Sequence, residues 1–242
     1  MPYGRRLPLL AAAASIVLLV ALGLALFSAP MDVDQGFSQK IFYVHVPMAI
    51  IALGGFVAGG IFGAQHLRTG DPRSDLRSYV CIHLSVVLGV GVLATGMIWA
   101  KAAWGVWFEW REPTLVSFLI IFLLYCTYQP LRFSIEDPDR QRRYASVFAV
   151  IAGAFTPIAF AAVRLGDSFI HPKVLNEGGA DLPAGMKAPF YLAIVGMLLL
   201  FVALYRYELS HKHARARVRS LRRKLGGDLA PVGRSAAPQV HA

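Results

Sequence analysis

Two histidines and a tryptophan-rich segment are the residues of this sequence best suited to holding a ligand. His45 lies in segment 42–47, FYVHVP, and His171 lies in segment 169–172, FIHP. Between them in sequence is segment 104–110, WGVWFEW. Two neutral imidazoles from separate segments can ligate a heme iron from its two sides, and a porphyrin also needs a flat aromatic surface. The residues therefore indicate heme as a candidate ligand, with the two histidines as its axial ligands.

Each of these features also has a simpler explanation. Trp and Tyr concentrate at membrane interfaces, so three tryptophans near the end of a span can be an aromatic belt and no more. A single histidine at the entrance of a span is more often a hydrogen-bonded interface residue than a metal ligand. The residues alone leave both explanations open.

The aromatic segment has a helical periodicity that would suit a planar ligand. Read as a helix of about 100° per residue, one face carries Trp104, Trp107, Phe108, Trp110 and Arg111. We expect such a helix to lie flat at the membrane interface beneath the porphyrin. Three nearby basic residues are candidates to pair with the heme propionates: Lys101, Arg111 and Arg164.

The elements that must position these residues are membrane-spanning helices. Of the 242 residues, 56% are hydrophobic and 16% are charged, whereas soluble domains are about 25% charged. A bilayer core takes about 20 apolar helical residues to cross. Six stretches come near this requirement: 9–27, 46–64, 79–99, 114–128, 144–163 and 189–205. We predict an all-α membrane protein, a bundle of six transmembrane helices with a tryptophan-rich interfacial segment on the outer face.

The Lys and Arg residues between the predicted spans indicate the orientation of the bundle. The N-terminus, loops 65–78 and 129–143 and the C-terminal tail together carry 18 of them, and the other segments carry six. Because cytoplasmic segments are enriched in Lys and Arg, we expect both termini in the cytoplasm. Segments 28–45, 100–113 and 164–188 would then share the outer face, which brings both histidines and the tryptophans to one side.

The chain divides into a six-span membrane domain, residues 1–205, and a basic cytoplasmic tail, residues 206–242. Nine of the 24 Lys and Arg lie between Arg206 and Arg234. A basic run directly after a hydrophobic span indicates contact with anionic lipid headgroups of the bilayer, and we expect no nucleic-acid partner. The sequence has no C-x-x-C-H motif, so any heme would be bound without a covalent link.

The same residues resemble a known family, the heme exporter protein C (CcmC) family of cytochrome c maturation, whose members share a tryptophan-rich WWD domain. Segment 40–47, KIFYVHVP, is similar to the family segment that ends in His-Val-Pro. Segment 99–110, WAKAAWGVWFEW, resembles the tryptophan-rich signature. His171 falls in the last outer loop, where the family has its second histidine. The resemblance covers nearly the whole chain apart from the longer basic tail.

The signature departs from the family pattern at three places. The family usually has Trp-Gly-x-Trp-Trp-x-Trp-Asp-x-Arg-Leu-Thr, and here Phe108 replaces the second Trp of the pair. Without a gap, Arg111 occupies the Asp position. If Arg111 is a one-residue insertion, Glu112 supplies the acid and Leu115 falls into register, and we prefer this alignment. The usual Arg is missing in either case.

The resemblance implies a heme transport and delivery protein of the cell inner membrane rather than an enzyme. His45 and His171 would be the axial ligands of non-covalent heme b, and five residues would form its platform: Trp104, Gly105, Trp107, Phe108 and Trp110. The implied partners are a periplasmic heme chaperone, ABC-type transporter subunits and a small single-span accessory subunit.

Three other functions can be compared with this one. An electron-transferring membrane cytochrome b would place paired histidines within the spans. A cofactor-free permease or assembly subunit would show no heme absorbance. A cytochrome c synthase of the same superfamily would be larger and would carry additional intramembrane histidines.

Overall fold

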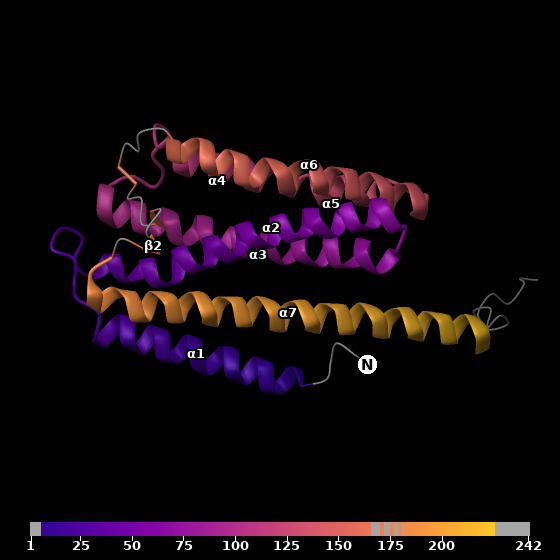
Figure 1. Cartoon of the computed structure of the whole chain (residues 1–242), viewed down its shortest axis with the longest axis horizontal. Helices are drawn as coiled ribbons and strands as arrows, with labels where there is room; N and C mark the ends of the chain where they lie inside the picture. The colour runs from indigo at the N-terminus through magenta and orange to yellow at the C-terminus, as the bar shows by residue number, and fades with distance from the viewer. Residues whose placement is uncertain (1–5, 166–169, 172–174, 177–178, 181, 226–242) are drawn as a thin grey trace, which may run out of the picture.

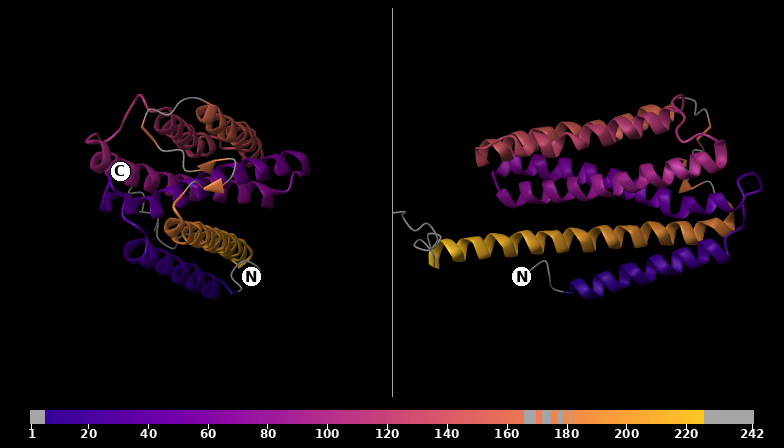
Figure 2. Two further views of the ribbon diagram at one scale, coloured as in Figure 1. Left: turned by 60° about the vertical axis from the view of Figure 1, so that its left-hand side comes forward. Right: turned by 180° about the vertical axis from the view of Figure 1, so that it is seen from behind.

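The protein folds into a bundle of long helices that lie side by side along one axis (Figures 1 and 2). The computed structural model describes residues 6–165, 170–171, 175–176, 179–180 and 182–225. In chain order the elements are α1 (Leu7–Phe27), the 3-10 helix η1 (Phe37–Ile41), α2 (Phe42–Thr69), α3 (Pro72–Trp104), α4 (Pro113–Cys126), α5 (Tyr128–Phe133), α6 (Pro138–Leu165), β1 (Leu175–Asn176), β2 (Gly179–Ala180) and α7 (Ala184–Leu225).

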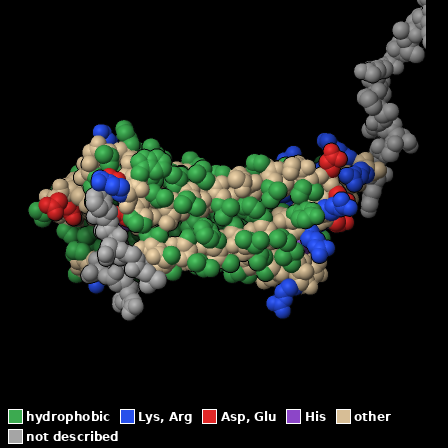
Figure 3. Space-filling model, turned by 90° about the horizontal axis from the view of Figure 1, so that it is seen from above, with side chains coloured by type: hydrophobic (Ala, Val, Ile, Leu, Met, Phe, Trp, Pro, Cys, Tyr) green, Lys and Arg blue, Asp and Glu red, His purple; other side chains and the backbone are tan. Residues whose placement is uncertain are grey.

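The described part of the chain contains six helical segments long and apolar enough to cross a membrane, with α4 and α5 together forming the fourth. Hydrophobic side chains cover the long middle of the face seen in Figure 3, and charged side chains gather toward its two ends. This distribution is expected where lipid surrounds the middle of a helical bundle. The predicted all-α bundle of six spans is confirmed, and the antiparallel pair β1–β2 is a small addition to it.

The helices extend beyond the predicted spans because their ends are set by capping residues outside the apolar core. Gly70 ends α2 with a left-handed φ of 69°, a conformation that glycine adopts without strain. The Asp71 side chain then accepts a hydrogen bond from the Arg73 N–H at 3.0 Å and starts α3, as an N-terminal cap does. The turn between α2 and α3 is therefore fixed by Gly70 and Asp71.

Helix α2 lies at the centre of the bundle and packs against α3, α6 and α7, while α1 packs on α7. Its contact with α6 brings two backbones together. A Cβ atom added to Gly60 would lie 2.9 Å from the Ala149 carbonyl oxygen and 3.0 Å from the Gly153 Cα. Small residues at a helix crossing permit such an approach, so this pair of glycines holds α6 close to the helix that carries His45.

The connections of the bundle separate into two ends. One end, called here the His45 end, carries loop 28–36, segment 105–112 and the pair β1–β2 (Figure 1). The opposite end, called the Arg132 end, carries the α2–α3 turn, the start of α1 and the far end of α7 (Figures 1 and 2). The described parts of the three segments predicted for the outer face therefore lie at one end of the bundle.

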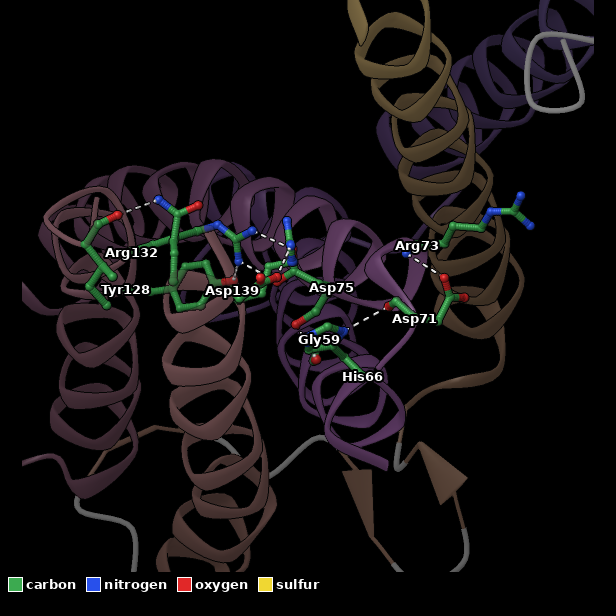
Figure 4. A network of polar contacts seen from close by, with 12 residues as sticks. Gly59, His66, Asp71, Arg73, Asp75, Tyr128, Arg132 and Asp139 are labelled. Carbon is green, nitrogen blue, oxygen red and sulfur yellow. Dashed lines mark hydrogen bonds and ion pairs between the residues drawn. The ribbon is translucent and has the colours of Figure 1, made fainter. Parts of the chain in front are cut away.

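A buried ion pair joins two helices near the Arg132 end (Figure 4). The Arg132 guanidinium of α5 donates to both carboxylate oxygens of Asp75 in α3, at 2.7 and 2.6 Å, and to the Tyr128 hydroxyl at 3.2 Å. Asp75 and Arg132 are only 4% and 7% exposed. A paired arrangement of this kind makes burial of both charges possible.

The predicted boundary between membrane domain and tail, at residues 205 and 206, falls inside α7. This helix continues without a break to Leu225, and its residues from Arg215 to Arg223 are exposed. The basic part of the chain therefore begins as an extension of the last spanning helix. Its assignment as a separate lipid-binding tail stays a prediction.

Candidate functional site

Both predicted histidines line one cavity at the His45 end of the bundle. The cavity itself measures about 180 Å³ and opens outward, and the empty space within it and at its mouth together is about 1460 Å³. Ring side chains surround the two imidazoles: Trp99, Trp104, Trp107, Phe108 and Phe160. Leu53 and Ile121 line it as well. Two imidazoles among aromatic and aliphatic walls fit the chemistry of a heme.

His45 is presented by the first turn of α2 and oriented by α3. Its Nδ1 lies 3.0 Å from the Thr95 hydroxyl oxygen, and that hydroxyl donates its proton to the Gly91 carbonyl at 2.8 Å. With its one proton directed at the Gly91 carbonyl, the hydroxyl accepts from the imidazole, and this hydrogen-bond network assigns the ring hydrogen to Nδ1. The lone pair of the neutral ring then lies on Nε2, the free nitrogen that a metal ion can bind.

The surface of α3 holds the His45 ring closely. A Cβ atom added to Gly96 would lie 2.8 Å from the imidazole Cε1, so glycine is needed there for the ring to lie against the helix. The Trp99 ring meets the imidazole edge-on at 5.8 Å between centroids, and its indole N–H donates to the Gln35 side-chain oxygen at 2.7 Å. Helix α3 therefore fixes both the position and the tilt of His45.

His171 reaches the same cavity from the connection that follows α6. Its ring lies 6.4 Å from the Trp104 ring, at an interplanar angle of 67°. Its backbone N–H and that of Ile170 donate to Glu112 Oε2 at 3.0 and 2.8 Å. Because Trp99 and Trp104 both belong to the last part of α3, the two histidines flank the same helix end.

Glu112 lies at the junction of the aromatic segment and α4. Its Oε1 accepts from the Thr114 N–H at 3.3 Å and so caps α4, and the side chain is fully buried, with 0% exposed. Burial raises the pKa of the Glu112 carboxyl. The hydrogen bonds from the N–H groups of Ile170, His171 and Thr114 lower it by a larger amount, so that the net pKa lies below its usual 4.5. The buried side chain is therefore a carboxylate.

The prediction of a helix through the tryptophan-rich segment is wrong. Helix α3 ends at Trp104, because Gly105 takes a left-handed conformation with a φ of 77° and its N–H bonds to the Lys101 carbonyl at 3.2 Å. Residues 105–112 follow without helical structure. A glycine directly after a helical stretch is a common stop signal, and it was present in the sequence.

The five predicted platform residues have different positions. Trp104, Trp107 and Phe108 line the cavity. Gly105 ends α3 and sets the direction in which the chain continues. Trp110 lies outside the cavity lining, is 70% exposed and contacts the Phe108 ring at 4.6 Å between centroids. Whether these residues bind heme stays a prediction.

The basic residues predicted to pair with propionates lie outside the described lining of the cavity. Lys101 Nζ donates to the Gly105 carbonyl at 2.8 Å, and Arg111 forms an ion pair with Glu109 at 3.1 Å. That pair lowers the pKa of the Glu109 carboxyl and raises that of the Arg111 guanidinium. The side chain of Arg164 lies outside the described part of the chain.

Sequence reasoning did not identify Thr95, Gly96 or Trp99 as neighbours of His45, nor Glu112 as a partner of the His171 backbone. These contacts join segments 50 to 59 positions apart in sequence, and no local pattern signals them. Among the described residues there is no group of three or more His, Cys, Asp or Glu side chains that could hold a metal. Two imidazoles suit an iron whose other four positions a porphyrin occupies, more than a bare ion.

Comparison with known proteins extends these observations to the whole chain. A family model described as heme exporter protein C (CcmC) matches residues 2–224. A heme exporter protein C from Bradyrhizobium diazoefficiens is 33% identical over 221 residues, which is 90% of this chain and 82% of that protein. The heme exporter protein C of Paracoccus denitrificans is 31% identical over 74% of this chain and 74% of its own length. That of Escherichia coli is 29% identical over 82% of this chain and 80% of its own length.

Proposed function

Because the chain belongs to the heme exporter protein C (CcmC) family, we propose that it holds heme b non-covalently in the cavity at the His45 end and delivers it for cytochrome c maturation. The observation that carries this proposal is the shared cavity of His45 and His171. The two imidazoles come from α2 and from the connection after α6, and each would supply one nitrogen ligand to the heme iron.

The residues around the two histidines would contribute to heme binding in different ways. Thr95 keeps the metal-binding lone pair of His45 on Nε2. Trp104, Trp107 and Phe108 offer flat surfaces to the porphyrin, and Trp110 supports Phe108. Gly105 ends α3 so that the chain can turn and bring these rings to the cavity. In this proposal the protein catalyses no reaction; it binds heme and releases it.

The open mouth of the cavity suits transfer of the ligand to a second protein. We infer that the His45 end faces the periplasm and that both termini lie on the cytoplasmic side of the inner membrane. The excess of Lys and Arg at the other end and in the tail supports this orientation. The partners we propose are a periplasmic heme chaperone, ABC-type transporter subunits and a small single-span accessory subunit, with anionic lipid around the basic extension of α7.

An absorbance spectrum of the gently solubilised full chain tests the proposal. The wild-type protein should show a heme Soret band that is lost or strongly weakened in His45→Ala and in His171→Ala. His66→Ala is the matched control, because His66 lies at the opposite end of the same helix and bonds to the Asp71 carbonyl at 2.9 Å. Full heme retention in both ligand variants would overturn the proposal. A quinone-linked redox couple without chaperone binding would favour the cytochrome b alternative.

A further inference from the structure

The two proposed ligands are held in place by different means. His45 lies inside α2, where the helix and the Thr95 hydroxyl both restrain it. His171 lies outside regular helix and strand, and the described hydrogen bond of its backbone N–H runs to a side chain, the Glu112 carboxylate. The position of His171 therefore depends on a contact between segments that are 59 positions apart.

The Glu112 side chain is suited to this contact because it gathers three backbone donors. Its Oε2 accepts from Ile170 and His171, and its Oε1 accepts from Thr114. A fully buried carboxylate is costly unless such bonds compensate it, and bonds to an ionised acceptor are shorter and stronger than neutral ones. The same oxygens thus cap α4 and fasten the chain at residues 170 and 171.

We propose that Glu112 is a positioning residue that holds the His171 imidazole at the cavity through the backbone, and that its negative charge is required for this. The inference rests on the proposed function only for the statement that His171 ligates iron. The N–H groups that bond to Glu112 belong to His171 itself and to its neighbour, so a shift of this backbone shifts the ring.

Three variants of the full chain separate charge from shape. Glu112→Gln keeps the size of the side chain but removes the charge, and its NH₂ group cannot accept a hydrogen bond. Glu112→Asp keeps the charge on a shorter side chain. Glu109→Gln makes the same chemical change three positions earlier, where the carboxylate pairs with Arg111, and serves as the matched control.

The first measurement needs no heme. Hydrogen–deuterium exchange, resolved to single amides, should show protection of the Ile170 and His171 N–H groups in the wild-type apoprotein. In Glu112→Gln these amides should exchange about 10- to 150-fold faster, the factor expected when a hydrogen bond to a charged group is lost. Glu112→Asp should fall between the two, and Glu109→Gln should match the wild type.

The second measurement is the absorbance spectrum of the same variants loaded with heme. Glu112→Gln should convert part of the six-coordinate low-spin signal into a five-coordinate high-spin signal, the form also expected of the heme that His171→Ala retains, while Glu112→Asp should keep more of the low-spin form. A general loss of stability would instead lower the amount of bound heme without changing the ratio of the two forms.

The outcomes distinguish this inference from the proposed function. Unchanged exchange at both amides in Glu112→Gln would overturn the positioning role, whatever the spectra show. Faster exchange with an unchanged spectrum, in a protein whose His171→Ala variant also keeps its spectrum, would support the contact but remove His171 as a ligand. Equal behaviour of Glu112→Asp and Glu112→Gln would refute the requirement for charge.

Discussion

Gly96 is a suitable position to test the site, because the His45 ring packs against α3 where this residue has no side chain. Gly96→Ala would place a Cβ atom 2.8 Å from the imidazole Cε1, whereas ordinary contacts begin at 3.4 Å. The ring must therefore move by about 0.6 Å. A shift of this size away from Thr95 takes the 3.0 Å bond between Nδ1 and the Thr95 hydroxyl beyond the usual range of about 2.7–3.2 Å.

The expected loss is one of heme affinity rather than of stability. Disturbing the group that orients a ligating histidine typically costs about 10- to 100-fold in metal affinity. Alanine in a helix interior is more favourable than glycine by roughly 0.5–1 kcal/mol, so the variant should unfold at a temperature no lower than the wild type, provided that the ring moves freely.

Gly54→Ala is the matched control, since apart from its chain neighbours and its own helix backbone no atom lies within 4 Å of the added Cβ atom. It should gain the same helix propensity without disturbing any ring. Heme dissociation constants come from competition with apomyoglobin, followed by Soret absorbance, and unfolding from thermal melts of the apoproteins. Equal heme affinity of the two alanine variants would refute the placement of the imidazole against α3.

The remaining predictions concern three further residues. Thr95→Val should weaken heme binding about 10- to 100-fold in the same competition assay because the ligand imidazole loses its acceptor, whereas Thr95→Ser should bind like the wild type. Asp75→Asn should lower the free energy of unfolding by about 3–5 kcal/mol, since it leaves the buried Arg132 charge uncompensated, and heme affinity of the folded fraction should stay unchanged. The pKa of Glu112 lies below 4.5, so the stabilisation from its carboxylate is complete above that pH and is lost as the pH falls through the lowered pKa of the folded state. Protection of the Ile170 and His171 amides, corrected for intrinsic exchange, should therefore stay constant from about pH 5 to about pH 8.

The general architecture of this protein could be predicted from the sequence because lipid imposes strong rules. Six apolar stretches, separated by turn residues such as Gly70 and Asp71, are enough to define the spanning helices. Four spans lie between the segments of His45 and His171, and an even number of crossings returns the chain to the same end of the bundle. Both histidines accordingly line one cavity.

The details of the site could not be predicted because they depend on contacts between distant segments. The periodicity of the aromatic segment favours a helix, but Gly105 stops α3 and the chain turns. The Thr95 hydroxyl faces His45, and the Glu112 carboxylate reaches the His171 backbone, only once α2, α3 and α4 are packed. Such pairs leave no trace in composition or spacing, so geometry was required to find them.

The proposed function depends on one iron being bound by His45 and His171 together. Electron paramagnetic resonance of the ferric, heme-loaded full chain, with its histidines labelled with nitrogen-15, tests this directly. The wild type should give a low-spin signal with hyperfine couplings from two histidine nitrogens, and this low-spin signal should be lost in His45→Ala and in His171→Ala. A signal with a single histidine coupling, or one that survives both substitutions unchanged, would contradict the proposal.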